Sequence, residues 1–202
     1  MRRDIFYKII RSYYKVWYNG EKTKGEMQNE FKKNYGARFF TCEAEELAKK
    51  LIGKIICHED FDGKEKFVIK ARITATEAYR KVDSCLDDNR TQKTTSQSLA
   101  GGHLHFHNAG NGRRRIDIVA NEVGVSESVL IAGVDMYDGP FKTLWILDID
   151  DPQYDGLDLL SPDSKIWIED DGTIAELNNA TQRKNISDTT PLRFTAKIFK
   201  FR

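Results

Sequence analysis

Cysteine is scarce in this sequence of 202 residues. The three cysteines, Cys42, Cys57 and Cys85, form no Cys-x-x-Cys pair. An odd number of cysteines without such spacing argues against a disulfide framework and against a cysteine-rich metal site. The sequence therefore indicates a protein of a reducing compartment, long enough to be stabilised by a hydrophobic core of its own.

Long hydrophobic runs are also lacking. No apolar stretch approaches the ~20 residues that a membrane-spanning helix needs. Near the N-terminus, Arg2 and Arg3 precede a segment in which lysines interrupt the aromatic residues, so the continuous apolar core of a signal peptide is missing. We therefore expect a protein without a membrane partner, located in the cytoplasm.

The chain has almost no net charge, +1 at pH 7, but its charges are unevenly distributed. Residues 1–38 contain ten Lys/Arg and four Asp/Glu, whereas residues 135–171 contain eleven acidic residues and two lysines. A further basic run, Arg113, Arg114 and Arg115, follows a glycine-containing loop. Basic patches of this kind suit an anionic partner such as nucleic acid, although most charge runs are simply solvated surface.

The first 37 residues differ in pattern from the rest. Apolar side chains recur at helical spacing over residues 5–18, and Asn19-Gly20 is expected to end that helix. The polar segment 20–37 reads as a linker. We therefore predict an N-terminal helical extension over residues 1–37 and a main domain over residues 38–202.

The main domain shows both helical and strand patterns. Thr41 is a candidate N-cap for a helix whose apolar seam is Leu47, Leu51 and Ile52 and which Gly53 ends. A helical or irregular piece is expected at residues 141–149. Strands are predicted at residues 54–58, 67–79, 103–107, 115–120, 129–134, 165–169 and 192–201. The pattern indicates a mixed α/β (α+β) single domain with a mostly antiparallel sheet.

The strand over residues 67–79 contains a carboxylate in an apolar setting. Alternation along a strand places Ile73, Ala75, Glu77 and Tyr79 on one face. Desolvating a carboxylate is costly unless the group is paired or hydrogen-bonded. Glu77 is therefore either a structural partner in an ion pair or a functional group, and this segment alone leaves both alternatives open.

The strand over residues 103–107 contains three of the four histidines of the chain. His103, His105 and His107 alternate with Leu104 and Phe106, so they share one strand face. Alternating imidazoles can share a metal ion, but no nearby Cys/His cluster supplies further ligands. A polar, partly solvated strand face is the alternative.

Several stretches, in order along residues 39–202, resemble motifs of the alkyladenine (3-methyladenine) DNA glycosylases, enzymes that excise alkylated purines in base-excision repair. Residues 73–79 resemble the active-site strand E-T-E-A-Y, with Ala75 at the position of its first glutamate. Further matches are residues 102–104 with G-H/T-L, 129–131 with V-L-[LI], 139–140 with G-P and 191–194 with P-[LW]-R-F. Residues 1–37 lie outside the resemblance.

The resemblance implies a curved sheet and a hydrolytic activity. By resemblance, Glu77 deprotonates the water that attacks the sugar and stabilises the oxocarbenium-like charge. A base inside a duplex has to be flipped out and stacked on an aromatic face. The implied base pocket contains Tyr79, His105, His107 and Asp117. No metal or cofactor belongs to this scheme, which implies a monofunctional hydrolase associated with the nucleoid.

The chain departs from the family pattern at several positions. His105 and His107 stand where the family has two pocket tyrosines, and Asp117 stands where it has an asparagine. Gly110 occupies the position of the tyrosine that fills the gap left by the flipped base, and Ala132 that of an arginine. A glycine cannot wedge a base stack, so single-stranded DNA, which needs no wedge, is an alternative to a damaged duplex as the substrate.

Basic and polar side chains near these positions are candidates for contacts with DNA phosphates. The predicted DNA-binding residues are Asn111, Arg113, Arg114 and Arg183. Two alternatives to the glycosylase remain: a nucleic-acid-binding relative without catalytic activity, and a metal- or small-molecule-binding module built on the histidine face.

Overall fold

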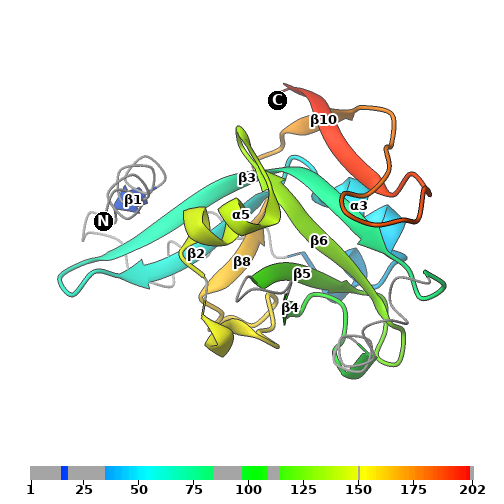
Figure 1. Ribbon diagram of the computed structural model, residues 1–202. Helices are drawn as coiled ribbons and strands as arrows, with labels where there is room; N and C mark the ends of the chain where they lie inside the picture. Colours follow the sequence, from blue (N-terminus) through cyan, green and yellow to red (C-terminus); the bar gives the residue numbers. More distant parts are fainter. Residues whose placement is uncertain (1–14, 18–34, 84–96, 109–113, 150, 201–202) are drawn as a thin grey trace.

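The computed structural model describes residues 15–17, 35–83, 97–108, 114–149 and 151–200 (Figure 1). Its strands are β1 (Lys15–Trp17), β2 (Ile55–Phe61), β3 (Lys66–Tyr79), β4 (Leu104–Asn108), β5 (Arg114–Ala120), β6 (Glu127–Val134), β7 (Tyr137–Asp138), β8 (Ile166–Glu169), β9 (Ile174–Leu177) and β10 (Arg193–Lys200). Its helical elements include α3 (Ala44–Leu51), α5 (Pro140–Leu147) and the short 3-10 turns η1 (Ala37–Phe39) and η3 (Pro152–Tyr154).

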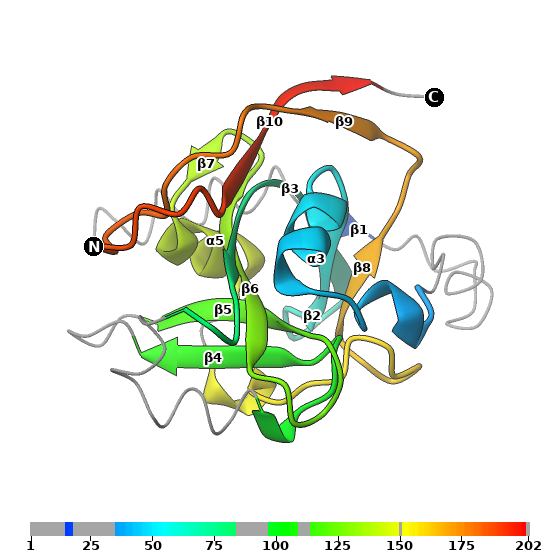
Figure 2. The same ribbon diagram turned by 90° about the vertical axis from the view of Figure 1, so that its right-hand side faces the viewer.

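The strands form one curved sheet in the order β4-β5-β6-β3-β10-β9, with β1 and β2 also paired to β3, β7 to β6 and β8 to β2. Every pairing among these strands is antiparallel. Figure 2 shows α3 and α5 lying beside β3 and β6. The predicted mixed fold, a single domain with a curved antiparallel sheet flanked by helices, is confirmed.

The helix predicted over residues 5–18 is wrong where the structure describes it. Residues Lys15–Trp17 form β1, whose Val16 lies opposite Val68 of β3. An unpaired strand edge offers backbone hydrogen bonds that outweigh a weak local helical pattern, and Val16 and Trp17 are residue types that suit strands. The rest of residues 1–34 lies outside the described part of the chain.

Helix α3 covers the central strand and helps to form the main core. Its side chains Leu47 and Leu51 are fully buried, as the predicted seam required. The residue at its N-cap is Glu43 rather than Thr41, and the Glu43 side chain makes no capping hydrogen bond. Instead, Oε2 of Glu127 accepts a hydrogen bond from the backbone N–H of Ala44 at 2.9 Å. The hydroxyl of Thr76 on β3 donates a hydrogen bond to the carbonyl of Ala48 at 2.9 Å, which ties the helix to the strand.

An irregularity in β3 changes which face its later side chains occupy. The register against β6 shifts between Ile73 and Ala75 and again between Ala75 and Thr76, as in a β-bulge. Ile73 therefore packs in the main core, whereas Ala75 and Tyr79 belong to a second, smaller apolar cluster. The prediction that Ile73 shares the face of Glu77 is wrong, because alternation breaks at the bulge.

Opposite the bulge, β6 contains a glycine that allows β3 and β7 to lie close to its backbone. A Cβ atom at Gly133 would lie 2.9 Å from the carbonyl oxygen of Tyr137 and 3.2 Å from the Cβ of Ala75. Any larger residue would therefore push β7 or β3 away. Gly133 thus helps to fix the bulge that turns Glu77 and Tyr79 toward the second cluster.

The remaining predicted elements appear with small changes of boundary. The histidine strand begins at Leu104, and His103 forms only an isolated bridge to Asp158. The segment predicted as helical or irregular is α5, which starts with Pro140 after Gly139 (φ 133°). Strands β7 and β9 were not predicted, because two- and four-residue strands leave little alternation to detect. No helix among the described residues is long and apolar enough to cross a membrane.

A buried histidine links β2 to the yellow part of the chain in Figure 1. The Nδ1 atom of His58 lies 2.7 Å from the carbonyl oxygen of Leu147, and its Nε2 atom lies 3.0 Å from the hydroxyl of Tyr154. Burial lowers the pKa of His58 from its ordinary value of 6.5. His58 is therefore a neutral structural link at physiological pH.

This lowered pKa predicts a loss of stability in mild acid. Below pH 6.5 the unfolded chain binds a proton at His58 that the folded protein does not, so the free energy of unfolding falls as the pH drops, by at most about 1.4 kcal/mol per pH unit for this group. Urea unfolding between pH 7.5 and 5 would measure it. His58→Gln should unfold with a smaller pH dependence over this range. Equal slopes for the two proteins would contradict the assignment.

Candidate active site

Strand pairing assembles a row of side chains across five strands. Directly opposite residues in an antiparallel pair point to the same face of the sheet. Glu77 of β3 lies opposite Arg193 of β10 on one side and Leu130 of β6 on the other. The row continues from Leu130 to Asp117 of β5 and to His105 of β4. Residues from four distant parts of the sequence therefore face the same side of the sheet as Glu77.

Glu77 is almost fully buried, with 2% of its surface exposed. Its Oε1 atom accepts two hydrogen bonds, one from Nη1 of Arg193 at 2.7 Å and one from the backbone N–H of Lys184 at 3.1 Å. Its Oε2 atom accepts a longer hydrogen bond, 3.3 Å, from the hydroxyl of Tyr79. The ion pair that the sequence left as one alternative is thus present, and it offsets the cost of burying the carboxylate.

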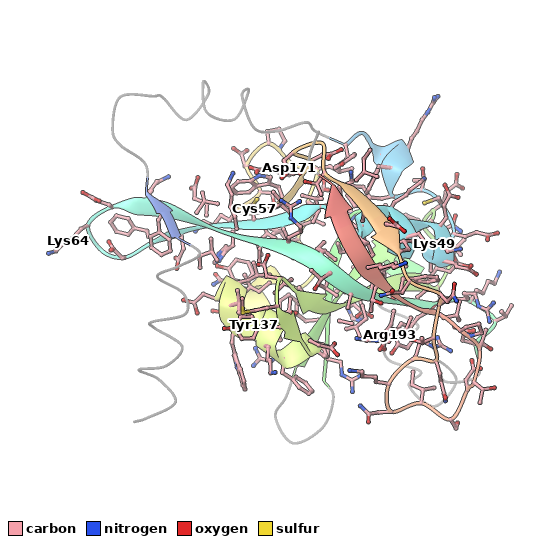
Figure 3. All side chains as sticks on the ribbon, turned by 90° about the horizontal axis from the view of Figure 1, so that it is seen from above. Lys49, Cys57, Lys64, Tyr137, Asp171 and Arg193 are labelled. Atoms are coloured by element: carbon pink, nitrogen blue, oxygen red, sulfur yellow. The ribbon has the colours of Figure 1, made fainter. Side chains whose placement is uncertain are left out.

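Arg193 is itself held by a second carboxylate. Its Nη2 atom donates to Oδ1 of Asp138 at 2.6 Å, and the ammonium group of Lys184 binds the other oxygen of Asp138. Burial alone would raise the pKa of Asp138, but Lys184 and Arg193 together hold it below its usual range. Figure 3 labels Arg193 at the end of β10 that lies beside β3. The site therefore contains a chain of charges, Asp138–Arg193–Glu77.

Tyr79 lies beside Glu77 on the same face, as predicted. Its ring is buried, and burial, followed by the charges of Glu77 and Asp117, raises the pKa of its hydroxyl well above the ordinary value. The guanidinium of Arg183 lies 4.9 Å from the ring centroid. A cation in this position is attracted to the electron-rich face of the ring and fixes its orientation. Tyr79 thus remains a neutral hydrogen-bond donor with one ring face occupied.

Arg183 is placed differently from the prediction. It is 2% exposed, and its Nη1 atom donates to the carbonyl of Ala78 at 2.8 Å and to Asp83 at 2.7 Å, while its Nη2 atom donates to Asp188 at 2.6 Å. A buried guanidinium engaged by two carboxylates is not presented to a DNA phosphate. The predicted phosphate contact is therefore corrected to a structural role, in which Arg183 fastens the segment before β10 to the end of β3.

Two of the predicted pocket residues lie further along the row. Asp117 is buried and accepts a hydrogen bond from the hydroxyl of Ser128 at 3.0 Å. His105 is buried as well, and its Nδ1 atom lies 3.2 Å from Oδ1 of Asp155, which also accepts the backbone N–H of Phe106 at 2.8 Å. The structure therefore brings Glu77, Tyr79, Asp117 and His105 to one face of the sheet.

The other predicted contacts are described only in part. The backbone of His107 in β4 pairs with Arg115, and nothing further is described of its side chain. Arg114 is half-buried at the start of β5. Asn111 and Arg113 lie outside the described residues, and so does Gly110.

The histidine face does not gather a metal-binding group in the part of the chain that the structure describes. His103 lies 2.9 Å from the carbonyl oxygen of Ala100 through its Nδ1 atom, whereas His105 is engaged by Asp155. No set of three or more His, Cys, Asp or Glu side chains among the described residues is close enough to hold an ion.

Sequence reasoning missed three residues of the site: Arg193, Asp138 and Lys184. Arg193 stands in the P-[LW]-R-F stretch and Asp138 directly precedes Gly139-Pro140, so two of the matched motifs marked their positions. A buried carboxylate requires a cation as its partner. Arg193 is the cation in the matched stretch of residues 191–194, so this requirement could have identified it. Lys184 binds Asp138 through its ammonium group and Glu77 through its backbone N–H, and a side-chain pattern gives no signal for the backbone contact.

The structure thus shows a curved antiparallel sheet with a buried carboxylate and a tyrosine on one face. A sequence model of the methylpurine-DNA glycosylase (MPG) family matches residues 38–199. A protein of Chlorobaculum parvum (strain DSM 263 / NCIMB 8327), named "Putative 3-methyladenine DNA glycosylase", is 30% identical over 183 residues, which cover 79% of this chain and 85% of that protein.

The chain belongs to the methylpurine-DNA glycosylase family. The resemblance inferred from the short motifs is thereby confirmed. Membership of this family places the protein among the DNA glycosylases of base-excision repair and implies that it binds DNA.

Proposed function

We propose that this protein is a monofunctional DNA glycosylase that hydrolyses the N-glycosidic bond of alkylated or deaminated purines, using a water molecule activated by Glu77. The observation that carries the proposal is the geometry of Glu77: a buried carboxylate with one oxygen fixed by Arg193 and the other beside the hydroxyl of Tyr79. We place the protein in the cytoplasm, associated with the nucleoid, where its DNA substrate would be.

The chemistry follows from this geometry. Departure of the base leaves positive charge on the sugar, which a nearby carboxylate stabilises in a site from which water is largely excluded. Water then attacks the anomeric carbon of the sugar and loses a proton to Glu77. An N-alkylated cationic purine leaves with the electron pair of the glycosidic bond and becomes neutral. A neutral purine such as hypoxanthine leaves as an anion and takes up a proton from solvent water. The scheme needs no metal or cofactor.

Base recognition is assigned to the same face of the sheet. A flipped purine has to stack on an aromatic ring, and we assign this role to the face of Tyr79 opposite Arg183. Only 7% of Tyr79 is exposed, so the side chains around the ring have to move to admit the base. Asp117 and His105 lie further along the row, where they would meet the polar edge of the base. His107 is proposed as a further pocket residue, and Asn111, Arg113 and Arg114 as contacts to phosphates.

Base release from defined oligonucleotides tests this function. We expect free 7-methylguanine or hypoxanthine to appear by liquid chromatography, with one alkali-labile abasic site per base released and no strand cleavage before alkali treatment. Release should persist in EDTA. Each lesion should be tested in single-stranded and duplex DNA. Salt-sensitive DNA binding without release of any of these bases would overturn the proposed activity and favour a DNA-binding relative without catalysis.

A further inference from the structure

We propose that Arg193, braced by Asp138, is the positioning residue that decides which oxygen of Glu77 accepts the proton from the attacking water. This inference rests on the proposed function and assigns a role to a residue of the site. It depends on the geometry of one guanidinium group between two carboxylates.

Strand pairing holds the backbone of Arg193 in place, independently of the contacts that its side chain makes. Arg193 lies opposite Glu77 in the pairing of β10 with β3. On its other side it exchanges two backbone hydrogen bonds with Thr181, at 2.9 and 3.0 Å. Only 5% of Arg193 is exposed. The side chain therefore starts from a strand that is held on both edges.

The guanidinium then connects the two acids. Nη2 binds Asp138 at 2.6 Å and Nη1 binds Oε1 of Glu77 at 2.7 Å. The donors of a guanidinium form a rigid fork, so fixing one nitrogen fixes the direction of the other. Asp138 thus sets the orientation of the group that holds Glu77.

The two oxygens of Glu77 become inequivalent as a result. Oε1 accepts hydrogen bonds from Arg193 and from the backbone of Lys184, and both donors keep it turned toward β10. Oε2 has the longer contact, 3.3 Å, from Tyr79. After the purine has left with the electron pair of the broken bond, the water oxygen bonds to the anomeric carbon and the proton of this water therefore moves to Oε2.

A departure from the family pattern makes this role of Arg193 more important. Family motifs place a glutamate at Ala75 and an arginine at Ala132. In the structure Ala75 and Ala132 pack together with Leu130 and Tyr79, and Ile186 covers them. Both positions are therefore apolar in this chain. The guanidinium that contacts Glu77 comes from β10 instead.

Arg193→Ala tests the inference under single-turnover conditions. Without the guanidinium, Glu77 loses its orientation, and the rate of base release should fall about 100-fold, since misplacing a reacting group by about 1 Å costs this much. The concentration of lesion DNA that gives half the maximal rate should change little. Guanidinium ion at millimolar concentration should restore part of the rate in Arg193→Ala and leave the wild-type rate unchanged. Arg193→Lys should retain an intermediate rate.

Two further variants complete the experiment. Asp138→Asn should reduce the rate by less than Arg193→Ala, because Arg193 loses only its brace; the Asp138 side chain is about half exposed, so this variant should fold. Lys197→Ala is the matched control, since Lys197 is an exposed cation on the same strand, 4.0 Å from Glu176. Its rate should equal that of the wild type.

The outcomes separate this inference from the proposed function. If the wild type releases no base from any lesion, the proposed function is wrong and this role falls with it. If the wild type is active and Arg193→Ala releases base at the same rate, only the role of Arg193 is wrong. If Arg193→Ala does not fold, a wild-type rate for Asp138→Asn overturns the role. A loss that neither guanidinium nor Arg193→Lys restores also overturns it.

Discussion

Replacing Glu77 with glutamine is expected to lower the rate of base release by about 1,000-fold, within the range typical for loss of a general base. The glutamine side chain has the same size, but its amide neither accepts the proton of the attacking water nor carries a charge opposite the developing cation. Arg193 keeps its contact with Asp138, so the buried guanidinium retains one anionic partner. Single-turnover release from a 7-methylguanine oligonucleotide measures the effect.

The affinity of Glu77→Gln for lesion DNA should equal or exceed that of the wild type, because the variant loses a negative charge next to a polyanion. Glu176→Gln provides the matched control, since Glu176 is an exposed glutamate on β9. It should release base at the wild-type rate. Wild-type release by Glu77→Gln would remove the carboxylate from the mechanism and leave Glu77 as a structural ion-pair partner only.

Replacing Arg183 with methionine is expected to lower the free energy of unfolding by roughly 3 kcal/mol, near the lower end of the cost of breaking a buried ion pair. The change removes the guanidinium from Asp83, whose side chain is 1% exposed, and from the ring of Tyr79. We expect the smaller end of the range for this loss of unfolding free energy, because Arg80 also contacts Asp83, at 3.0 Å, and remains as a cationic partner in the variant. Urea denaturation measures the effect.

A double variant shows whether the buried charge causes this loss. Arg183→Met combined with Asp83→Asn should recover part of the stability, since the uncompensated carboxylate is gone. Lys49→Met removes an exposed cation from an i,i+4 pair on α3 (Figure 3) and should cost no more than about 0.5 kcal/mol. A loss for Arg183→Met no larger than that for Lys49→Met would contradict the structural role of Arg183.

Sequence patterns predicted the parts of this protein that depend on local periodicity. Alternation located the long strand β3, and the seam of Leu47 and Leu51 located α3, because each pattern extends over several residues of one element. The pairing of Glu77 with Tyr79 on one face followed from a spacing of two residues. The helix and strand patterns also predicted the mixed α/β domain with a mostly antiparallel sheet, and the family resemblance added that the sheet is curved.

The features that sequence patterns missed depend on contacts between distant segments. Strand β1 forms because β3 offers an edge, and the bulge at Ala75 depends on Gly133 in another strand. Arg193 stands in a matched motif and Arg183 does not, but the sequence does not indicate what either guanidinium contacts. Only the pairing of β10 with β3 shows that one binds Glu77 and the other lies against Tyr79.

A crystal structure of Glu77→Gln bound to an oligonucleotide containing 7-methylguanine would test the central claim most directly. The account predicts that the damaged base is turned out of the DNA and stacked on the ring of Tyr79, with the anomeric carbon of its sugar and a water molecule within about 3.5 Å of each other beside residue 77. DNA bound along a different surface, with the base still stacked in its helix and far from residue 77, would contradict it.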